Sequence, residues 1–329
     1  MKHATEIKKI IKVKWPNAKI KSIREFPEGY NNIAFDVKLS NGNYVIKLIK
    51  LKGYEKYSLK QKHLRTLVRK KFKDFPIPKI IKSDFSKKLI DKPYIIAEKI
   101  EGKSLQSAHK GILNKKELYS EIGELYGKLH SFKLKKYGEL DPSLKIIKKY
   151  PSWYLENCKN VEKLFEKIGL NRLLSDKSLE RSREFFKKNK YLLKKELGPR
   201  LCHGDAAQTN ILVKKLRSKY TVSGIIDFEF ANASGITKEL FSGLRTFEKK
   251  WEYKESLVEG YSKWGKLPKE WEKLALFYNW MGNLGQLARI KKMKWRKLNE
   301  EDTKKRKREL RSKALLTLRK TAKIIEVIE

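Results

Sequence analysis

The sequence has few of the residues that mark several large classes of protein. Only two cysteines, Cys158 and Cys202, occur among 329 residues, and no CxxC pair is present. A disulfide framework or a cysteine-based zinc site is therefore not expected. No apolar run approaches the roughly 18 residues of a membrane-spanning helix, and the first residues lack the apolar core of a signal peptide. We therefore expect a soluble, cytoplasmic protein with no membrane partner.

Acidic residues are also scarce. Lys and Arg total 79 against 38 Asp and Glu, which gives a formal net charge of +41. A positive field of this size attracts polyanions, of which nucleic acid is the commonest. Most of the excess is lysine, as biased codon usage would also produce. Two interpretations stay open: compositional drift, or an RNA-binding surface formed by the basic termini, residues 1–24 and 289–323.

The residues that are present predict a folded protein with a strand-rich part and a helical part. Apolar residues make up 40% and aromatic residues 11% of the chain, as in a globular protein. The first part is rich in strand signals, with one helix before the strands and one between the third and the fourth strand. The expected elements are a helix over 3–14, strands over 20–26, 33–39, 44–49, 79–84 and 93–99, and a basic helix over 55–73.

After residue 102 the pattern becomes helical. Helices are expected over 115–132, 151–168, 177–196, 236–246, 251–264, 268–294 and 302–325. In this half, strand signals surround only the stretches 201–213 and 224–230. The pattern predicts an α+β fold with an N-terminal antiparallel-sheet lobe, residues 1–97, and a larger helical C-terminal lobe, residues 98–329. Because no flexible linker separates them, the lobes are expected to pack together around a cleft.

Three short polar side chains lie at the ends of the two strand-like runs. His203-Gly204-Asp205 is followed by Asn210, and Asp227 ends the second run. Phosphoryl transfer needs a carboxylate that orients the attacking hydroxyl and oxygen ligands that hold Mg²⁺ on the phosphates. Asp205 fits the first role, and Asn210 with Asp227 fits the second. The alternative is that these are turn and cap residues, where Asp and Asn are favoured anyway.

Lys47 is a candidate for phosphate binding. It lies in the third predicted strand, in the sequence Tyr-Val-Ile-Lys. Strand alternation places it on one face with Val45 and Ile49, so a charge projects among apolar neighbours. A kinase needs such a lysine on its phosphates. The alternative is an exposed lysine in a lysine-rich chain, of which Lys50 is an example.

The motif His-x-Asp-x₄-Asn, followed by a strand and Ile-Asp-Phe, resembles the aminoglycoside phosphotransferase and choline kinase family of the protein-kinase-like fold. The resemblance extends over about 18–300 and is sharpest at the two motif stretches. It implies ATP and Mg²⁺ as cofactors, Asp205 as catalytic base, and Asn210 and Asp227 as metal ligands. It also implies that His203 braces the catalytic loop.

The same resemblance implies further nucleotide contacts. Gly29, Tyr30 and Asn31 lie where family members carry a turn that covers the phosphates. The stretch from Tyr94 to Gly102 resembles the hinge between the lobes, where adenine pairs with backbone groups near Glu98 and Ile100.

The chain departs from the family at two places. The lysine of the third strand is usually paired with a glutamate on the next helix, but here Lys60 or Gln61 stands at that position, and Glu55 is the carboxylate nearby. Downstream of the second motif, family members carry an Asp-Leu pair that braces the metal-binding segment. This chain has Glu239-Leu240, so we expect Glu239 to substitute.

The predicted function is therefore an ATP–Mg²⁺-dependent phosphotransferase that acts on a hydroxyl of a small molecule, aminoglycoside- or choline-like. Aromatic residues of the C-terminal half either hold an ammonium-bearing substrate by cation–π contacts or belong to the core: Trp153, Tyr154, Trp251, Tyr253, Tyr278 and Trp280. Two alternatives follow from the charge. One is a kinase of the same fold acting on RNA such as tRNA. The other is a catalytically weak kinase-like RNA-binding module, suggested by the absent helix glutamate.

Overall fold

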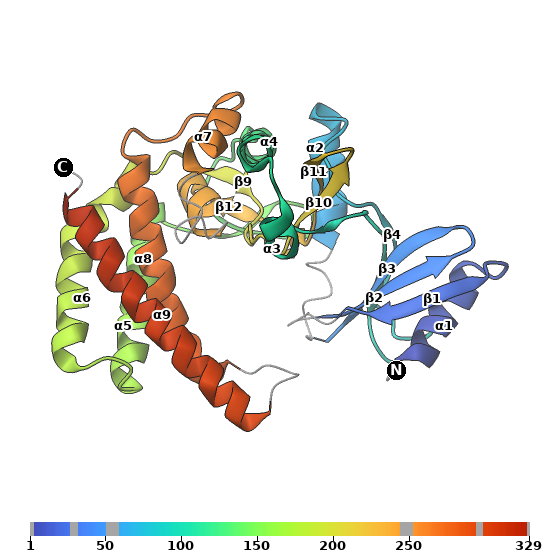
Figure 1. Ribbon diagram of the computed structural model, residues 1–329, viewed down its shortest axis with the longest axis horizontal. Coiled ribbons are helices and arrows are strands. Elements are labelled where there is room, and N and C mark those ends of the chain that lie inside the picture. The colour runs from blue at the N-terminus through green and yellow to red at the C-terminus, as the bar shows by residue number, and fades with distance from the viewer. Residues whose placement is uncertain (1–2, 27–31, 51–58, 244–252, 294–298, 328–329) are drawn as a thin grey trace.

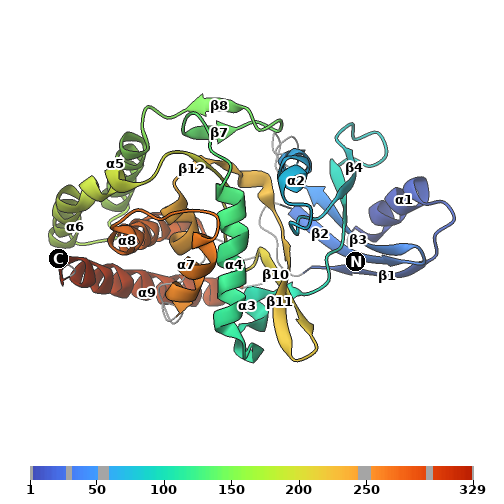
Figure 2. The same ribbon diagram turned by 90° about the horizontal axis from the view of Figure 1, so that it is seen from above.

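A computed structural model describes residues 3–26, 32–50, 59–243, 253–293 and 299–327 of the chain. It has an N-terminal part built around an antiparallel sheet and a larger, mainly helical C-terminal part (Figure 1). The same two parts lie side by side in the orthogonal view (Figure 2). The predicted mixture of an N-terminal sheet and C-terminal helices is confirmed.

The N-terminal sheet has five antiparallel strands in the order β1-β2-β3-β5-β4. Helix α1 (Ala4–Lys14) covers one face, where its isoleucines share a core cluster with alternate residues of β2 and β3. Ile46 and Leu48 point into that cluster, so Lys47 projects from the opposite face. The strands are β1 (Ile20–Glu25), β2 (Asn32–Leu39), β3 (Gly42–Ile49), β4 (Ile80–Asp84) and β5 (Tyr94–Glu98).

Helix α2 (Lys60–Lys71) falls within the predicted basic helix. Its buried Leu64 and Val68 belong to the same core cluster as residues of the C-terminal part, among them Phe228 and Ala231. The apolar face of α2 therefore packs on the helical part of the protein.

The helices of the C-terminal part enclose two apolar cores. One surrounds α4 and the motif strands, and the other lies between α5, α6, α8 and α9. The α-helices are α3 (Leu105–Ala108), α4 (Lys115–His130), α5 (Trp153–Leu170), α6 (Asp176–Asn189), α7 (Lys254–Ser262), α8 (Trp271–Arg289) and α9 (Glu300–Val327). In the described parts of the chain, no helix is long and apolar enough to cross a membrane.

The motif strands belong to two small sheets. The first has the order β11-β10-β6 and the second β8-β7-β12-β9. The expectation that strands in this half surround only the two motif stretches was wrong, because β6, β7, β8 and β12 are also present. Each has two to four residues, too few for an alternation signal in the sequence. The strands are β6 (Lys103–Ser104), β7 (Gly138–Leu140), β8 (Ile146–Lys149), β9 (Arg200–Cys202), β10 (Ile211–Leu216), β11 (Lys219–Ile225) and β12 (Asn232–Ser234).

Two helix predictions also need correction. The helix expected over 177–196 ends at Asn189 and continues as a 3₁₀ helix, η3 (Lys190–Lys195). The helix expected over 236–246 contains a π-helix, η5 (Lys238–Gly243), and residues 244–252 lie outside the described part. Helical periodicity marks the buried face but does not distinguish these tighter or wider turns.

Candidate active site

Residues 203–210 form a loop that connects β9 to β10 and carries the first motif. Asp205 is exposed on this loop. The Nδ2 group of Asn210 donates to the main-chain oxygen of Asp205 at 2.9 Å and to its Oδ2 atom at 3.0 Å. Asn210 therefore fixes both the loop and the carboxylate of Asp205.

His203 is buried beneath the same loop. Its Nδ1 atom accepts a hydrogen bond from the main-chain N–H of Asp205 at 3.2 Å, and its Nε2 atom donates to the carbonyl of Ile226 at 2.8 Å. Because an amide only donates and a carbonyl only accepts, these partners require the neutral ring with its proton on Nε2. His203 thus joins the loop to the residue that precedes Asp227.

Asp227 follows β11 and has a left-handed backbone, with φ of 72°. Its Oδ1 atom lies 2.8 Å from the Nζ atom of Lys47. Burial opposes both charges, but the ion pair outweighs it: the pKa of Lys47 is raised and the pKa of Asp227 is lowered. The structure therefore brings the strand lysine and the second motif together.

Glu229 adds a second carboxylate to this segment. It is buried, and burial together with the nearby charge of Asp227 raises its pKa to about 7. It lies in η4 (Phe228–Phe230), the short 3₁₀ helix after Asp227. Near neutral pH the Glu229 side chain is only partly ionised. The segment with Asp227 and Glu229 therefore carries less than two negative charges.

The donor set of the two motifs suits a hard divalent cation. Asn210 uses its Nδ2 group on Asp205, and in the described part of the chain no donor contacts its Oδ1 atom. Asp227 contributes a carboxylate that is held ionised. Amide and carboxylate oxygens are typical ligands of Mg²⁺. The oxygen atoms of Asn210 and Asp227 therefore fit a Mg²⁺ ion. Lys47, which pairs with Asp227, fits a phosphate group bound to that ion.

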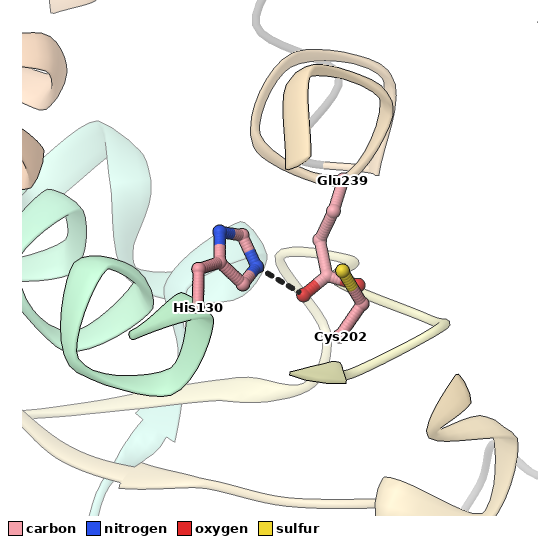
Figure 3. A group of neighbouring side chains, drawn as sticks. All are labelled: His130, Cys202 and Glu239. Atoms are coloured by element: carbon pink, nitrogen blue, oxygen red, sulfur yellow. Dashed lines mark hydrogen bonds and ion pairs between the residues drawn. The ribbon is translucent and has the colours of Figure 1, made fainter. Parts of the chain in front are cut away.

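Glu239 braces the catalytic loop from below. Its Oε1 atom accepts the main-chain N–H of His203 at 2.7 Å, and its Oε2 atom accepts that of Gly204 at 2.8 Å. His130 donates to Oε1 from its Nε2 atom at 2.9 Å (Figure 3). Burial opposes the charge of Glu239, but these donors hold its pKa below the usual value. The expected substitution of glutamate for the family aspartate is thus consistent with the contacts.

His130, Glu239 and Cys202 lie close enough together to suggest a metal site (Figure 3). Their chemistry argues against one. Both oxygens of Glu239 already accept hydrogen bonds from the loop amides, and the Nε2 group of His130 is used on Glu239. The cluster therefore acts as a hydrogen-bonded support for the loop.

Gly204 brings the loop 203–210 against the segment that follows Asp227. Its φ of +81° lies in the left-handed region, and an added Cβ would stand 1.9 Å from the carbonyl oxygen of Phe230. Only glycine permits this approach of the two backbones.

The other predicted nucleotide contacts are placed only in part. Gly29, Tyr30, Asn31 and Glu55 lie outside the described residues. Glu98 ends β5, where its main-chain N–H bonds to the carbonyl of Lys79 at 2.9 Å. Ile100 follows in the connection to the C-terminal part, and its side chain packs on Gly224 of β11. The hinge therefore rests directly on the strand that leads to Asp227.

The sequence reasoning missed the role of Lys60. Its Nζ atom is buried and donates to the carbonyl of Ala231 at 3.1 Å, while the neighbouring Gln61 donates to Pro78 at 3.2 Å. A signal was present, because Lys60 precedes Leu64 and Val68 at intervals of four residues. Helical periodicity places all three on the buried face.

The candidate aromatic cluster belongs largely to the core. Trp153, Tyr278 and Trp280 are at most 6% exposed. The Nε1 group of Trp153 donates to the hydroxyl of Tyr278 at 2.6 Å, and the cation over the Trp153 ring is Lys238, 5.3 Å from its centroid. These aromatic rings are therefore occupied by contacts within the chain.

A family model described as the phosphotransferase enzyme family matches residues 22–277. The chain belongs to this family. The predicted resemblance is thereby confirmed, and the chain is a phosphotransferase. No curated protein sequence matches the chain.

Solved structures share the fold over almost their whole length. The GDP and kanamycin complex of APH(2″)-IIIa is 17% identical, with a TM-score of 0.67 over 96% of this chain and 98% of that chain. A thermostable mutant of aminoglycoside phosphotransferase APH(4)-Ia, in complex with AMP-PNP and hygromycin B, is 14% identical, with a TM-score of 0.63 over 98% and 100%. A candidate fructosamine-3-kinase from Thermobifida fusca is 12% identical, with a TM-score of 0.58 over 90% and 94%. The predicted kinase-like fold is confirmed.

Proposed function

We propose that this phosphotransferase uses Mg²⁺-ATP to phosphorylate a hydroxyl group of a small molecule, of the aminoglycoside or choline type. The observation that carries the proposal is the convergence of Lys47, Asp227 and the pair Asp205–Asn210 from three separate stretches of sequence. Phosphoryl transfer depends on positioning and charge stabilisation, which such a group supplies.

Each side chain has a role in this proposal. Asp205 is exposed on its loop and is oriented by Asn210, as a base for the acceptor hydroxyl requires. Asp227 and the Oδ1 atom of Asn210 would hold Mg²⁺, which neutralises charge on the phosphates. Lys47 would contact the phosphates, and His203 and Glu239 would keep the loop in shape.

The comparisons support a purine nucleotide as the phosphate donor. Two structural relatives were crystallised with GDP and with AMP-PNP. Adenine would bind at the hinge beside Glu98 and Ile100. The turn Gly29-Tyr30-Asn31 would cover the phosphates. Because adenine and guanine both pair with hinge backbone groups, the donor is best tested with ATP and GTP together.

The nature of the acceptor follows less directly. Kanamycin and hygromycin B are bound by two of the relatives. A choline-like acceptor would need exposed aromatic rings around its ammonium group, and Trp153 and Tyr278 are buried in contacts of their own. An aminoglycoside or related amino sugar is therefore the first class to test.

The RNA alternatives start from the uncompensated positive charge and would gain support if the two basic terminal segments met in space. Helix α1 lies at one end of the molecule, and α9 runs from the opposite end toward the middle (Figures 1 and 2). The two helices do not lie side by side, so their arrangement adds no support for RNA as the acceptor.

The test is phosphate transfer from γ-labelled ATP or GTP to a panel that contains kanamycin, hygromycin B, choline, a fructosamine and total RNA. We expect label in an amino sugar, with no label from the variant Asp205→Ala. Label in RNA alone, or equal transfer by the variant, would contradict the proposal. A label in choline alone would exclude the amino sugar class but keep the enzyme.

A further inference from the structure

Helix α2 differs from the arrangement that the family resemblance implies. That pattern places a glutamate on this helix as partner of the strand lysine. The described helix carries no acidic residue in its first turn, and its sequence from Lys60 to Lys71 contains none. Lys47 instead pairs directly with Asp227. Within the described residues of the helix, no glutamate is available to pair with the strand lysine.

A different contact joins α2 to the same site. Lys60 is 4% exposed, and its Nζ atom donates to the carbonyl oxygen of Ala231 at 3.1 Å. Ala231 ends the short segment that begins at Asp227 and runs through η4. The next two residues on that face of the helix, Leu64 and Val68, share a core cluster with the segment. The helix thus contacts the segment Asp227–Ala231 by a hydrogen bond and by apolar packing.

Burial of a lysine is unfavourable unless its charge has partners. Burial lowers the pKa of Lys60 to about 8, and the nearby charges of Glu139, Asp141 and Glu229 act in the opposite direction. The ammonium group is therefore still mainly protonated near neutral pH. A methionine would fill the same space without this penalty, so the charge itself calls for an explanation.

The charges around the segment are arranged in pairs. Asp227 and Glu229 are two carboxylates separated by one residue. Lys47 approaches Asp227 from the sheet, and Lys60 approaches from α2, where Glu229 is among its charged neighbours. Lys47 thus contacts the start of the segment at Asp227, and Lys60 contacts its end at the Ala231 carbonyl.

We propose that Lys60 is a positioning residue that holds the segment Asp227–Ala231 against α2 and so keeps Asp227 ready to bind Mg²⁺. The role of Asp227 as a Mg²⁺ ligand is taken from the proposed function, and the present proposal rests on it. In this enzyme the helix acts on the metal-binding segment, where the family pattern has it act on the strand lysine. Lys60 does not touch substrate or metal; it acts through its hydrogen bond to the Ala231 carbonyl.

The expected effect follows from the population of the competent segment. If loss of the contact lowers that population tenfold, the apparent dissociation constant for Mg²⁺ rises tenfold. Loss of a charge-assisted hydrogen bond is of the size that produces roughly this change. A residue that only stabilised the fold would lower the melting temperature and leave the Mg²⁺ constant of the folded enzyme unchanged.

The experiment measures binding of a fluorescent ATP analogue as a function of Mg²⁺, together with kcat, for the full chain. The variants are Lys60→Met, Lys60→Arg and Lys60→Glu, with Lys62→Met as control, because Lys62 is exposed on the same helix. We expect about a tenfold higher Mg²⁺ requirement in Lys60→Met, near-normal values in Lys60→Arg, and the weakest binding in Lys60→Glu. The control is expected to match the wild type.

Several results would overturn the proposal. They are an unchanged Mg²⁺ constant in folded Lys60→Met, or a Lys60→Glu variant that matches or exceeds the wild type. If Lys60→Met does not fold, Lys60→Gln against Lys60→Arg separates charge from packing, and equal Mg²⁺ constants would count against the proposal. Absence of phosphate transfer in the wild type would refute the proposed function alone, because nucleotide binding is read independently. Absence of Mg²⁺-dependent nucleotide binding would refute both.

Discussion

Lys47 and Asp227 form an ion pair of 2.8 Å between residues that are 180 positions apart in the chain. The pair joins the open face of the N-terminal sheet to the segment that follows β11. In the proposed reaction both side chains change partners, Lys47 to the phosphates and Asp227 to the metal. In the nucleotide-free protein, the ion pair therefore keeps both side chains charged and close to the positions where they would bind the phosphates and the metal.

The two members of this pair have different predicted effects on binding. Asp227→Ala is expected to weaken Mg²⁺-dependent nucleotide binding by at least about tenfold, because it removes a metal ligand. Lys47→Ala is expected to lower kcat strongly while the Mg²⁺ requirement changes less. Calorimetric titration of nucleotide with and without Mg²⁺ measures both. Lys50→Ala is the control, because Lys50 is exposed and directly follows the same strand. An equal effect there would contradict the role of Lys47.

Asp205→Ala is expected to lower kcat by about 10²–10⁴, the usual contribution of a general base. Nucleotide affinity is expected to stay within about twofold of the wild type, since the binding roles fall to other residues. The measurement is a steady-state assay with an accepted substrate, beside nucleotide titration. Asp205→Asn provides a variant of the same size that cannot accept the proton. Wild-type turnover by either variant would show that the base lies elsewhere.

Glu239→Ala is expected to destabilise the protein by about 2–4 kcal/mol, because it leaves two buried main-chain amides without their acceptor. Glu239→Gln keeps one acceptor oxygen and is expected to lose less. Urea unfolding measures the difference, and kcat is expected to fall in the same order as the loop loses its support. A Glu239→Ala protein with unchanged stability and rate would contradict the bracing role.

Glu239 also predicts a pH dependence of stability. Its pKa in the folded protein lies below the ordinary value of 4.5, after burial is outweighed by its hydrogen bonds. An acid of this kind adds stability above its unfolded pKa, and the contribution is lost as pH falls through the folded value. In Glu239→Gln, the loss of unfolding free energy that Glu239 causes at low pH is expected to be absent, and urea unfolding across that pH range measures it.

Glu196 predicts the opposite dependence. It accepts hydrogen bonds from the main chain and the hydroxyl of Thr237 and lies 3.0 Å from the Tyr278 hydroxyl. Burial raises its pKa from 4.5 to about 7. The folded protein therefore binds the proton more tightly than the unfolded chain, so stability is expected to fall as pH rises from about 4.5 to about 7.

Unfolding by urea across that pH range tests this expectation. Glu196→Gln is expected to flatten the profile, because the amide resembles the protonated acid in size and carries no charge. Tyr278→Phe, which removes one hydrogen-bond partner, is expected to keep the slope. A wild-type profile that is flat or rises between these pH values would contradict the inference.

Local sequence signals were sufficient for the general architecture. The helix at Ile7, Ile10 and Ile11 and the strands of the first sheet were predicted because their periodicity places apolar residues on one face. The family was also recognisable, because the two motifs combine several polar positions at fixed spacing. The catalytic, metal and nucleotide roles, and the boundary near residue 97, stay predictions.

Short elements escaped prediction for a physical reason. Strands such as β6, with two residues, and β12, with three, exist because neighbouring strands offer hydrogen-bond partners. Their own residues carry no alternation long enough to detect. The π-helix at Lys238–Gly243 carries Glu239, whose partners are main-chain amides of the loop 203–210.

By itself the sequence determined which segments become helices and strands and which polar residues stand at their ends, because these depend on neighbours within a few positions. Tertiary structure decided the partners: Asp227 for Lys47, the Ala231 carbonyl for Lys60, and the loop amides for Glu239. Such partners lie tens to hundreds of residues apart. They are set by how the elements pack, and local sequence patterns do not encode that distance.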